Sequence, residues 1–88
     1  MVSMSEWDAQ EMVGEAALRL VQALAGRPPA VVVALLGGRR PPRVRLSKRE
    51  ERRLEKYRRA VRTVRRAGLG PLIYDQVAGV REMVRASA

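Results

Sequence analysis

Arginine dominates the middle of this chain, in a basic block that runs from residue 39 to residue 66. Fourteen of its 28 residues are Arg or Lys. The guanidinium group of Arg is planar, stays charged, and can donate two parallel hydrogen bonds to phosphate oxygens. The block therefore predicts binding to nucleic acid, and the candidate contact residues are Arg39, Arg40, Arg43, Arg45, Lys48, Arg52, Arg58, Arg59, Arg62, Arg65 and Arg66.

The charge of the chain is strongly segregated. Residues 1–26 carry a net charge of −3, residues 27–70 carry +12 and residues 71–88 carry zero, within a total of +9. An evenly basic surface would only keep a small protein soluble, and a solvated face remains the alternative for the block. A neutral-to-acidic scaffold with one concentrated basic stretch is more typical of a polyanion-binding surface.

Specific base recognition is a weaker expectation. The sequence contains no Asn, and its three Gln residues lie outside the basic block. Bidentate recognition of adenine uses those side chains, so we expect contacts with the phosphate backbone and little sequence preference. Charge on a rigid helix and few aromatic residues favour DNA over RNA, while single and double strands remain open.

Three aromatic residues could stack on bases. Tyr57 falls on the apolar side of its helix and is expected in the core. Tyr74 lies off the main apolar stripe of the last helix, roughly in line with Arg81, and is the best candidate for base stacking. Trp7 could pack at the start of the first helix or at an oligomer contact.

Catalysis and metal binding are not expected. The chain has no His and no Cys, which removes the commonest general base, a thiol nucleophile and the familiar zinc ligands. There is no GxxxxGK phosphate-binding loop. The glutamates of the block lie among arginines, which favour the ionised form over a proton-donating acid. We therefore expect no enzyme, no cofactor and no metal site.

A long helix over residues 48–67 must carry most of the basic block. Ser47 and Glu50 have the spacing of a capping box, and Gly68 is a suitable stop. About 20 residues give a rod about 30 Å long. At 100° per residue one side is apolar and the arginines cover the other. The apolar positions are Leu54, Tyr57, Val61 and Val64.

The rest of the chain predicts two further long helices and one short element. Apolar spacing indicates helices over residues 5–25 and 71–86. Residues 37–46 form a stiff basic connector, because paired glycines and prolines exclude regular structure. Residues 30–36 are uniformly apolar, and we favour a short buried helix there. The alternative is a hairpin with the alternating stretch that ends at residue 46.

The expected fold is therefore an all-α domain over residues 1–88, with three main helices and one short element. A chain of 88 residues without disulfides has a marginal core of its own, so self-association, most simply as a homodimer, is expected. The depletion of Asn, Gln and Cys is also a thermophile trend.

No secretory signal or membrane span is expected. The first residues are acidic rather than basic, and the longest apolar run has only seven residues. A location in the cytoplasm, including the nucleoid, follows. The roles that fit are an architectural protein, a single-strand binder or a small regulator. The alternative class is a non-catalytic interaction subunit of a larger protein or ribonucleoprotein assembly.

Overall fold

Four helices and no strands occur in residues 4–87, the part of the chain that this computed structural model describes. They are α1 (Glu6–Ala23), α2 (Pro29–Leu36), α3 (Lys48–Arg66) and α4 (Gly70–Ala86). The predicted all-α class is confirmed. The short apolar segment is a helix, so the alternative hairpin over residues 30–46 is wrong. Pro29 at the first helical position starts α2 with a backbone angle already suited to a helix.

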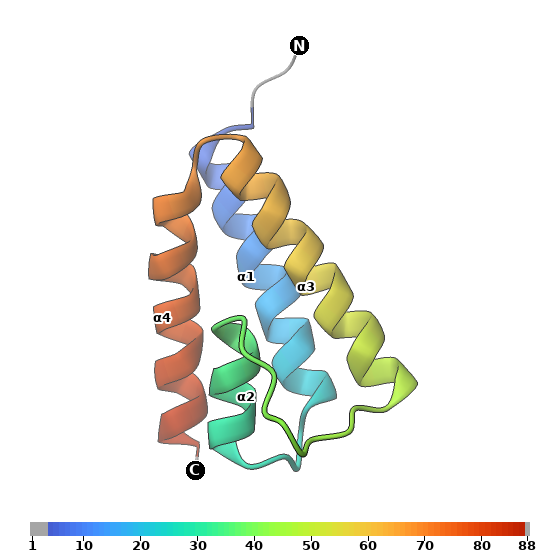
Figure 1. The fold of residues 1–88 in the computed structure, drawn as a ribbon. Coiled ribbons are helices and arrows are strands. Elements are labelled where there is room, and N and C mark those ends of the chain that lie inside the picture. Colours follow the sequence, from blue (N-terminus) through green and yellow to red (C-terminus); the bar gives the residue numbers. More distant parts are fainter. Residues whose placement is uncertain (1–3, 88) are drawn as a thin grey trace.

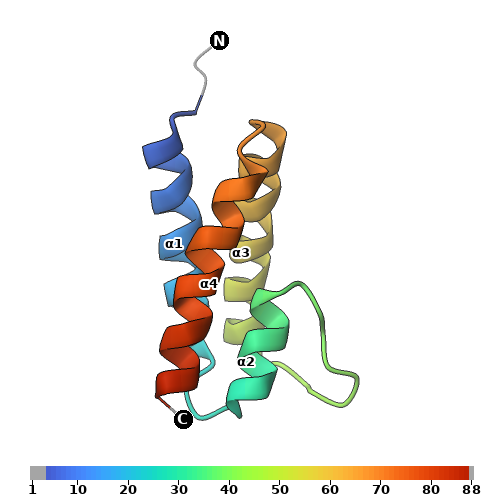
Figure 2. The same ribbon diagram turned by 90° about the vertical axis from the view of Figure 1, so that its left-hand side faces the viewer.

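The three long helices lie side by side and alternate in direction (Figure 1). α1 and α4 run the same way and α3 runs against both, while α1 packs against both of the others. The short helix α2 packs against the C-terminal half of α4, beside the lower part of that helix in the perpendicular view (Figure 2). The connector after α2 then returns along the molecule to the start of α3. This topology places α1 along one flank of α3 and α4 along the other.

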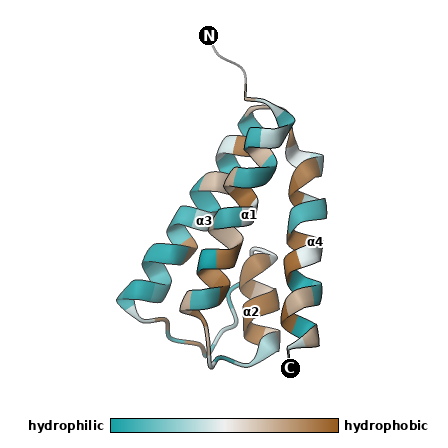
Figure 3. Ribbon diagram, turned by 180° about the vertical axis from the view of Figure 1, so that it is seen from behind, coloured by the Kyte–Doolittle hydropathy of each residue, from teal (hydrophilic) through white to brown (hydrophobic). Residues whose placement is uncertain are grey.

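The core is built from the apolar sides of all four helices. Val13 and Leu20 of α1, Leu35 of α2 and Leu54 and Val64 of α3 are among the completely buried side chains. The predicted apolar side of α3 therefore does face the core. Apart from that side, α3 is the most hydrophilic of the helices, as the colouring of the ribbon by hydropathy shows (Figure 3). Anchoring one side of the helix in this way leaves its charged side outward.

Local signals at the ends of α3 act as predicted. The Glu50 amide donates to Ser47 Oγ at 3.2 Å, and the Ser47 amide donates to Glu50 Oε1 at 2.8 Å, which completes the capping box. Gly68 takes a φ of +79°, and the Leu69 amide donates to the Val64 carbonyl at 3.1 Å. That pattern satisfies a carbonyl the helix leaves unpaired, and it turns the chain directly into α4.

The first helix is shorter than predicted. It ends at Ala23 rather than residue 25, with Leu24 as its C-terminal cap. Gly26 has a φ of +90°, and the Arg27 amide donates to the Leu24 carbonyl at 3.0 Å. The turn that follows α1 therefore begins two residues earlier than a helix stop at Gly26 alone predicts. Within residues 4–87, no helix is long and apolar enough to cross a bilayer.

Candidate nucleic-acid interface

The outer side of α3 carries a line of basic side chains. Arg52, Arg59 and Arg66 are exposed and follow one another at intervals of seven residues. Seven residues are nearly two helical turns, so the three side chains lie along one side of the helix about 10 Å apart. Lys48 is exposed near the beginning of the same helix. This row can follow a charged polymer along the helix axis.

Of the eleven basic residues predicted as contacts, ten are exposed. The exception is Arg58, which is half-buried. It lies toward α4 rather than on the outer side, where it lines a groove together with Arg62 and Arg65. The expectation of a single outward wall is therefore too simple, because α3 presents basic groups on its outer side and on both flanks.

Few of these predicted contacts are neutralised by carboxylates. Arg40 pairs with Glu51 at 2.7 Å and Arg62 pairs with Glu55 at 3.1 Å. The other nine form no ion pair within residues 4–87. Both pairs are solvent-exposed and contribute little energy, so they do not remove these arginines from competition for phosphate.

The expected intrahelical partners of the glutamates are different in the structure. Spacing along α3 would favour pairs of Glu51 and Glu55 with Arg58 and Arg59, one to two turns further along the helix, but neither arginine forms an ion pair with them. Glu51 instead binds Arg40 from the connector, whose hydrogen bond lowers the pKa of the carboxyl. This contact holds the connector beside the first turn of α3. The exposed arginines of the connector thereby extend the basic surface of the helix.

One basic residue just before the block has a structural role. Arg27 donates from Nε and Nη2 to the two carboxylate oxygens of Glu50 at 2.9 and 2.8 Å, and from Nη2 to the Arg45 carbonyl at 2.6 Å. Glu50 is only 7% exposed. The Arg27 hydrogen bonds, followed by that of the Ser47 amide, lower the pKa of Glu50 to about 2. The start of α3 is thus tied to the turn between α1 and α2.

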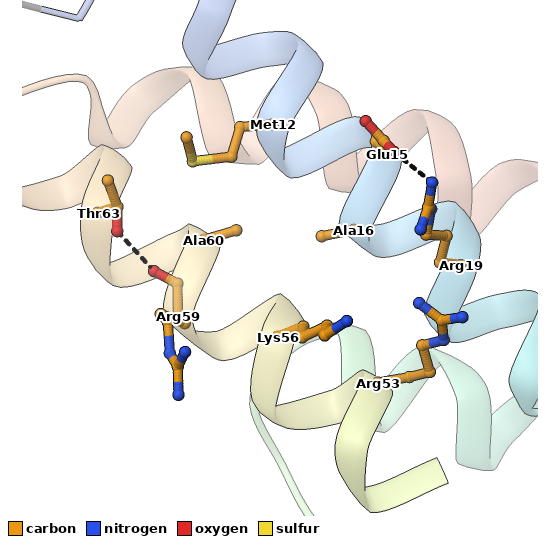
Figure 4. Close-up of a pocket in the computed structure, with 9 residues that line it drawn as sticks. All are labelled: Met12, Glu15, Ala16, Arg19, Arg53, Lys56, Arg59, Ala60 and Thr63. Atoms are coloured by element: carbon orange, nitrogen blue, oxygen red, sulfur yellow. Dashed lines mark hydrogen bonds and ion pairs between the residues drawn. The ribbon is translucent and has the colours of Figure 1, made fainter. Parts of the chain in front are cut away.

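A shallow groove of about 390 Å³ runs along the surface where α3 packs against α1. Its apolar surface comes from Met12, Ala16 and Ala60, and Glu15 pairs with Arg19 at 2.7 Å on the α1 side. In Figure 4, Arg53 and Lys56 extend from α3 toward α1, whereas Arg59 points away. This groove therefore mixes both signs of charge, and no aromatic residue lines it.

A larger groove of about 650 Å³ lies between α3 and α4, next to the end of α2. Four arginines line it and no carboxylate does. Three of them were predicted contacts, and the fourth, Arg81 of α4, was not. The signal for Arg81 was its position in line with Tyr74 on α4, which also lines the groove. Sequence spacing could not show that this line faces α3.

The aromatic residues separate into core and surface. Tyr57 is 3% exposed and its hydroxyl donates to the Leu36 carbonyl at 2.6 Å, so the prediction that it belongs to the core is confirmed. Burial raises the pKa of Tyr57, against the opposing effect of the positive charges of Arg81 and Arg65. Tyr74 is 80% exposed, as a stacking residue must be. Trp7 is also exposed.

Residues 4–87 contain no cluster of three or more His, Cys, Asp or Glu side chains that could hold a metal ion. Comparison with protein-family models, curated proteins and solved structures found no match to this chain.

Proposed function

We propose that this protein binds nucleic acid without catalysis, mainly through the phosphate backbone, with DNA preferred over RNA. The observation that carries the proposal is the solvent exposure of the basic block. Ten of its eleven predicted contact residues are exposed, while the apolar side of α3 is fixed in the core. A rigid rod whose cations are mostly unpaired is costly in self-repulsion and becomes favourable when it meets a polyanion.

The spacing of the charges supports a polymer rather than a single small anion. Arg52, Arg59 and Arg66 cover about 21 Å along α3, a length over which duplex DNA carries about 12 phosphates. The connector adds further arginines at one end. Since the block contains no Asn or Gln, the contacts have little sequence preference, which suits an architectural, single-strand-binding or small regulatory role.

A titration by fluorescence anisotropy tests the proposal. Labelled single-stranded DNA, duplex DNA and RNA are titrated with the purified protein at two salt concentrations. We expect binding that weakens steeply with salt. The variant Arg59→Gln/Arg66→Gln removes two charges from the outer row, and should lower the salt slope for duplex DNA by about 1.8, since each phosphate contact contributes about 0.9.

The matched control removes the same charge from elsewhere. Arg19→Gln/Arg85→Gln changes two exposed arginines of α1 and α4, each held only by a surface ion pair. It should leave the slope nearly unchanged. Equal losses for the two variants would mean that only net charge matters. No binding to any polymer would refute the proposal and favour the alternative class, an interaction subunit that acts only with a protein or ribonucleoprotein partner.

Self-association and a cytoplasmic location stay predictions. Large apolar side chains remain exposed on α1 and α4, namely Trp7, Leu18 and Met83. A second copy of the chain could cover them without bringing two basic blocks together. The mass of the free protein by light scattering, compared with its mass in the presence of a short oligonucleotide, tests this.

A further inference from the structure

The groove between α3 and α4 combines features that a phosphate-binding surface does not need. Its volume of about 650 Å³ lies within the range of sites that hold small molecules. The cations on its α3 wall are Arg58, Arg62 and Arg65, and Arg81 faces them from α4. With four cations and no carboxylate in its lining, the groove should attract an occupant that is strongly anionic.

The same groove has an apolar floor and an aromatic rim. Ile73 and Val77 are buried and Val61 is half-buried, and all three contribute to its lining. The Tyr74 ring belongs to that lining and is 80% exposed. An occupant that satisfied both parts would be anionic at one end and flat and apolar at the other. Inorganic phosphate or a simple carboxylate would leave the apolar part uncovered.

Arg81 is a groove residue with an unmet hydrogen-bonding requirement. Its Nε is buried and has no hydrogen-bond partner within residues 4–87. Its Nη2 lies where a side chain on residue 37 would be, 2.6 Å from the position of a Cβ on Gly37. No hydrogen bond holds Nε in its present place, so the guanidinium loses little by turning toward an anion in the groove. The C-terminus of α2 favours a positive charge there when the groove is empty.

We propose that this groove binds an unpaired nucleotide of a nucleic-acid strand, with the base stacked on Tyr74 and the adjacent phosphates held by Arg58, Arg65 and Arg81. The proposal rests on the proposed function and specifies the form of the polymer. A base within a duplex is stacked and paired, so its face cannot reach Tyr74. A single strand exposes that face, and stacking on an aromatic ring is largely independent of base identity.

The first test replaces the aromatic ring. Tyr74→Ala should weaken binding to a single-stranded DNA 12-mer by about 5- to 150-fold, the range that base–aromatic stacking provides, and should change duplex binding less than about twofold. Tyr74→Phe keeps the ring and should bind as the unchanged protein does. Because Tyr74 is so exposed, both variants should fold, which circular dichroism checks.

A 12-mer that carries abasic linkages separates stacking from phosphate binding. It retains every phosphate and lacks the bases. If the base contacts Tyr74, the abasic strand should bind the unchanged protein more weakly, and Tyr74→Ala should weaken it no further. An equal effect of Tyr74→Ala on intact and abasic strands would overturn the proposal, because the tyrosine would then act without a base.

The second test compares two arginines one turn apart on α4. Arg81→Gln should weaken single-strand binding and lower its salt slope by about 0.7, the contribution of one phosphate contact. Arg85→Gln removes the same charge from an exposed residue that does not line the groove, and should have little effect. Equal effects would show that Arg81 contributes only to net charge, and would overturn its place in the site.

The two proposals fail in different ways. If Tyr74→Ala has no effect while Arg59→Gln/Arg66→Gln weakens all polymers, the protein binds nucleic acid but the groove does not hold a base. If the unchanged protein binds no polymer, both proposals fail. If a free mononucleotide binds and the strand does not, the groove takes a small ligand and the strand proposal is overturned.

Discussion

The two grooves beside α3 share one wall and differ in the other. Toward α1, Arg53 and Lys56 extend toward a wall that carries Met12, Ala16 and the Glu15–Arg19 ion pair. Toward α4, Arg58, Arg62 and Arg65 border a larger groove that also contains Tyr74, Arg81 and a floor of apolar side chains. The basic helix is common to both grooves. The difference arises from the opposing helix, which adds the paired charges of Glu15 and Arg19 in the first groove and, within residues 4–87, an unpaired cation with an aromatic ring in the second.

The comparison shows why a count of arginines along α3 is incomplete. Each groove is lined by three basic residues of α3, so the helix alone would make them equivalent. An anion with a flat apolar part is better satisfied next to α4. We therefore expect the α1 side of α3 to contribute general attraction to phosphate and the α4 side to contribute selectivity for unpaired strands.

The largest expected effect comes from the anchor that both grooves share. Leu54, on the inner side of α3, is completely buried, and Leu54→Ala should lower the free energy of unfolding by about 2–5 kcal/mol. Because this variant unfolds at a lower temperature, its binding to duplex DNA and its binding to single strands should be lost together as it unfolds. Val61 is half-buried at the floor of the α4-side groove, so Val61→Ala should cost only about 1 kcal/mol. Urea titration of both variants measures the difference, and equal costs would contradict it.

Removing three charges from one side of α3 at a time tests the grooves directly. Arg58, Arg62 and Arg65 changed together to Ala should weaken single-strand binding about 100-fold or more without unfolding the protein, because hydrogen bonds to charged groups contribute about 1.5–3 kcal/mol each. The salt slope for single strands should fall by about 1.4, because Arg58 and Arg65 are the two residues of this set assigned to phosphates.

The corresponding triple variant on the other side is Arg53→Ala, Lys56→Ala and Arg59→Ala. It removes the same charge from the α1-side groove. We expect its effect on single strands to be clearly smaller, and its effects on single and double strands to be similar. Anisotropy titrations at matched salt give both numbers. If the two triple variants were indistinguishable, the two grooves would be functionally equivalent.

The smallest expected effect concerns the ionised carboxyl at the start of α3. Glu50 has a pKa of about 2 in the fold, well below its ordinary value of 4.5, because Arg27 and the Ser47 amide bond to the carboxylate. The stabilisation is therefore fully present above about pH 4.5 and is lost as the pH falls toward 2. The urea midpoint should decline across that window.

Glu50→Gln should remove this part of the pH dependence and lower stability at pH 7. Glu55→Gln is the control, because Glu55 forms only an exposed ion pair with Arg62. Since Glu50 lines neither groove, its loss should weaken both binding modes alike. A selective loss of single-strand binding would instead mean that the start of α3 positions the α4-side groove.

Much of the fold could be predicted because its signals are local. The capping box of Ser47 and Glu50 and the stop at Gly68 involve residues within one turn of each other. The exposure of Tyr74 and the burial of Tyr57 follow from helical spacing on a single element. The segment at 30–36 was ambiguous for the same reason, since a uniformly apolar run has no period and only packing against α4 settles it.

The candidate site was predicted only in part. The exposed arginines of α3 and the connector were found from composition and spacing. Arg81 was missed as a groove residue, and Arg58 was placed on the outer side, because spacing describes a helix without its neighbours. The paired hydrogen bonds from Arg27 to Glu50 join residues that are 23 positions apart in the sequence, and no periodicity links them.

The amino-acid sequence by itself determined where the long helices start and stop, which side of α3 is apolar, and that its charge is overwhelmingly positive. These properties depend on interactions within a few residues and on composition. Only the tertiary structure decided which arginines share a groove with an aromatic ring and which share one with a carboxylate. That outcome depends on which helices pack beside α3, and so on contacts between residues far apart in the chain.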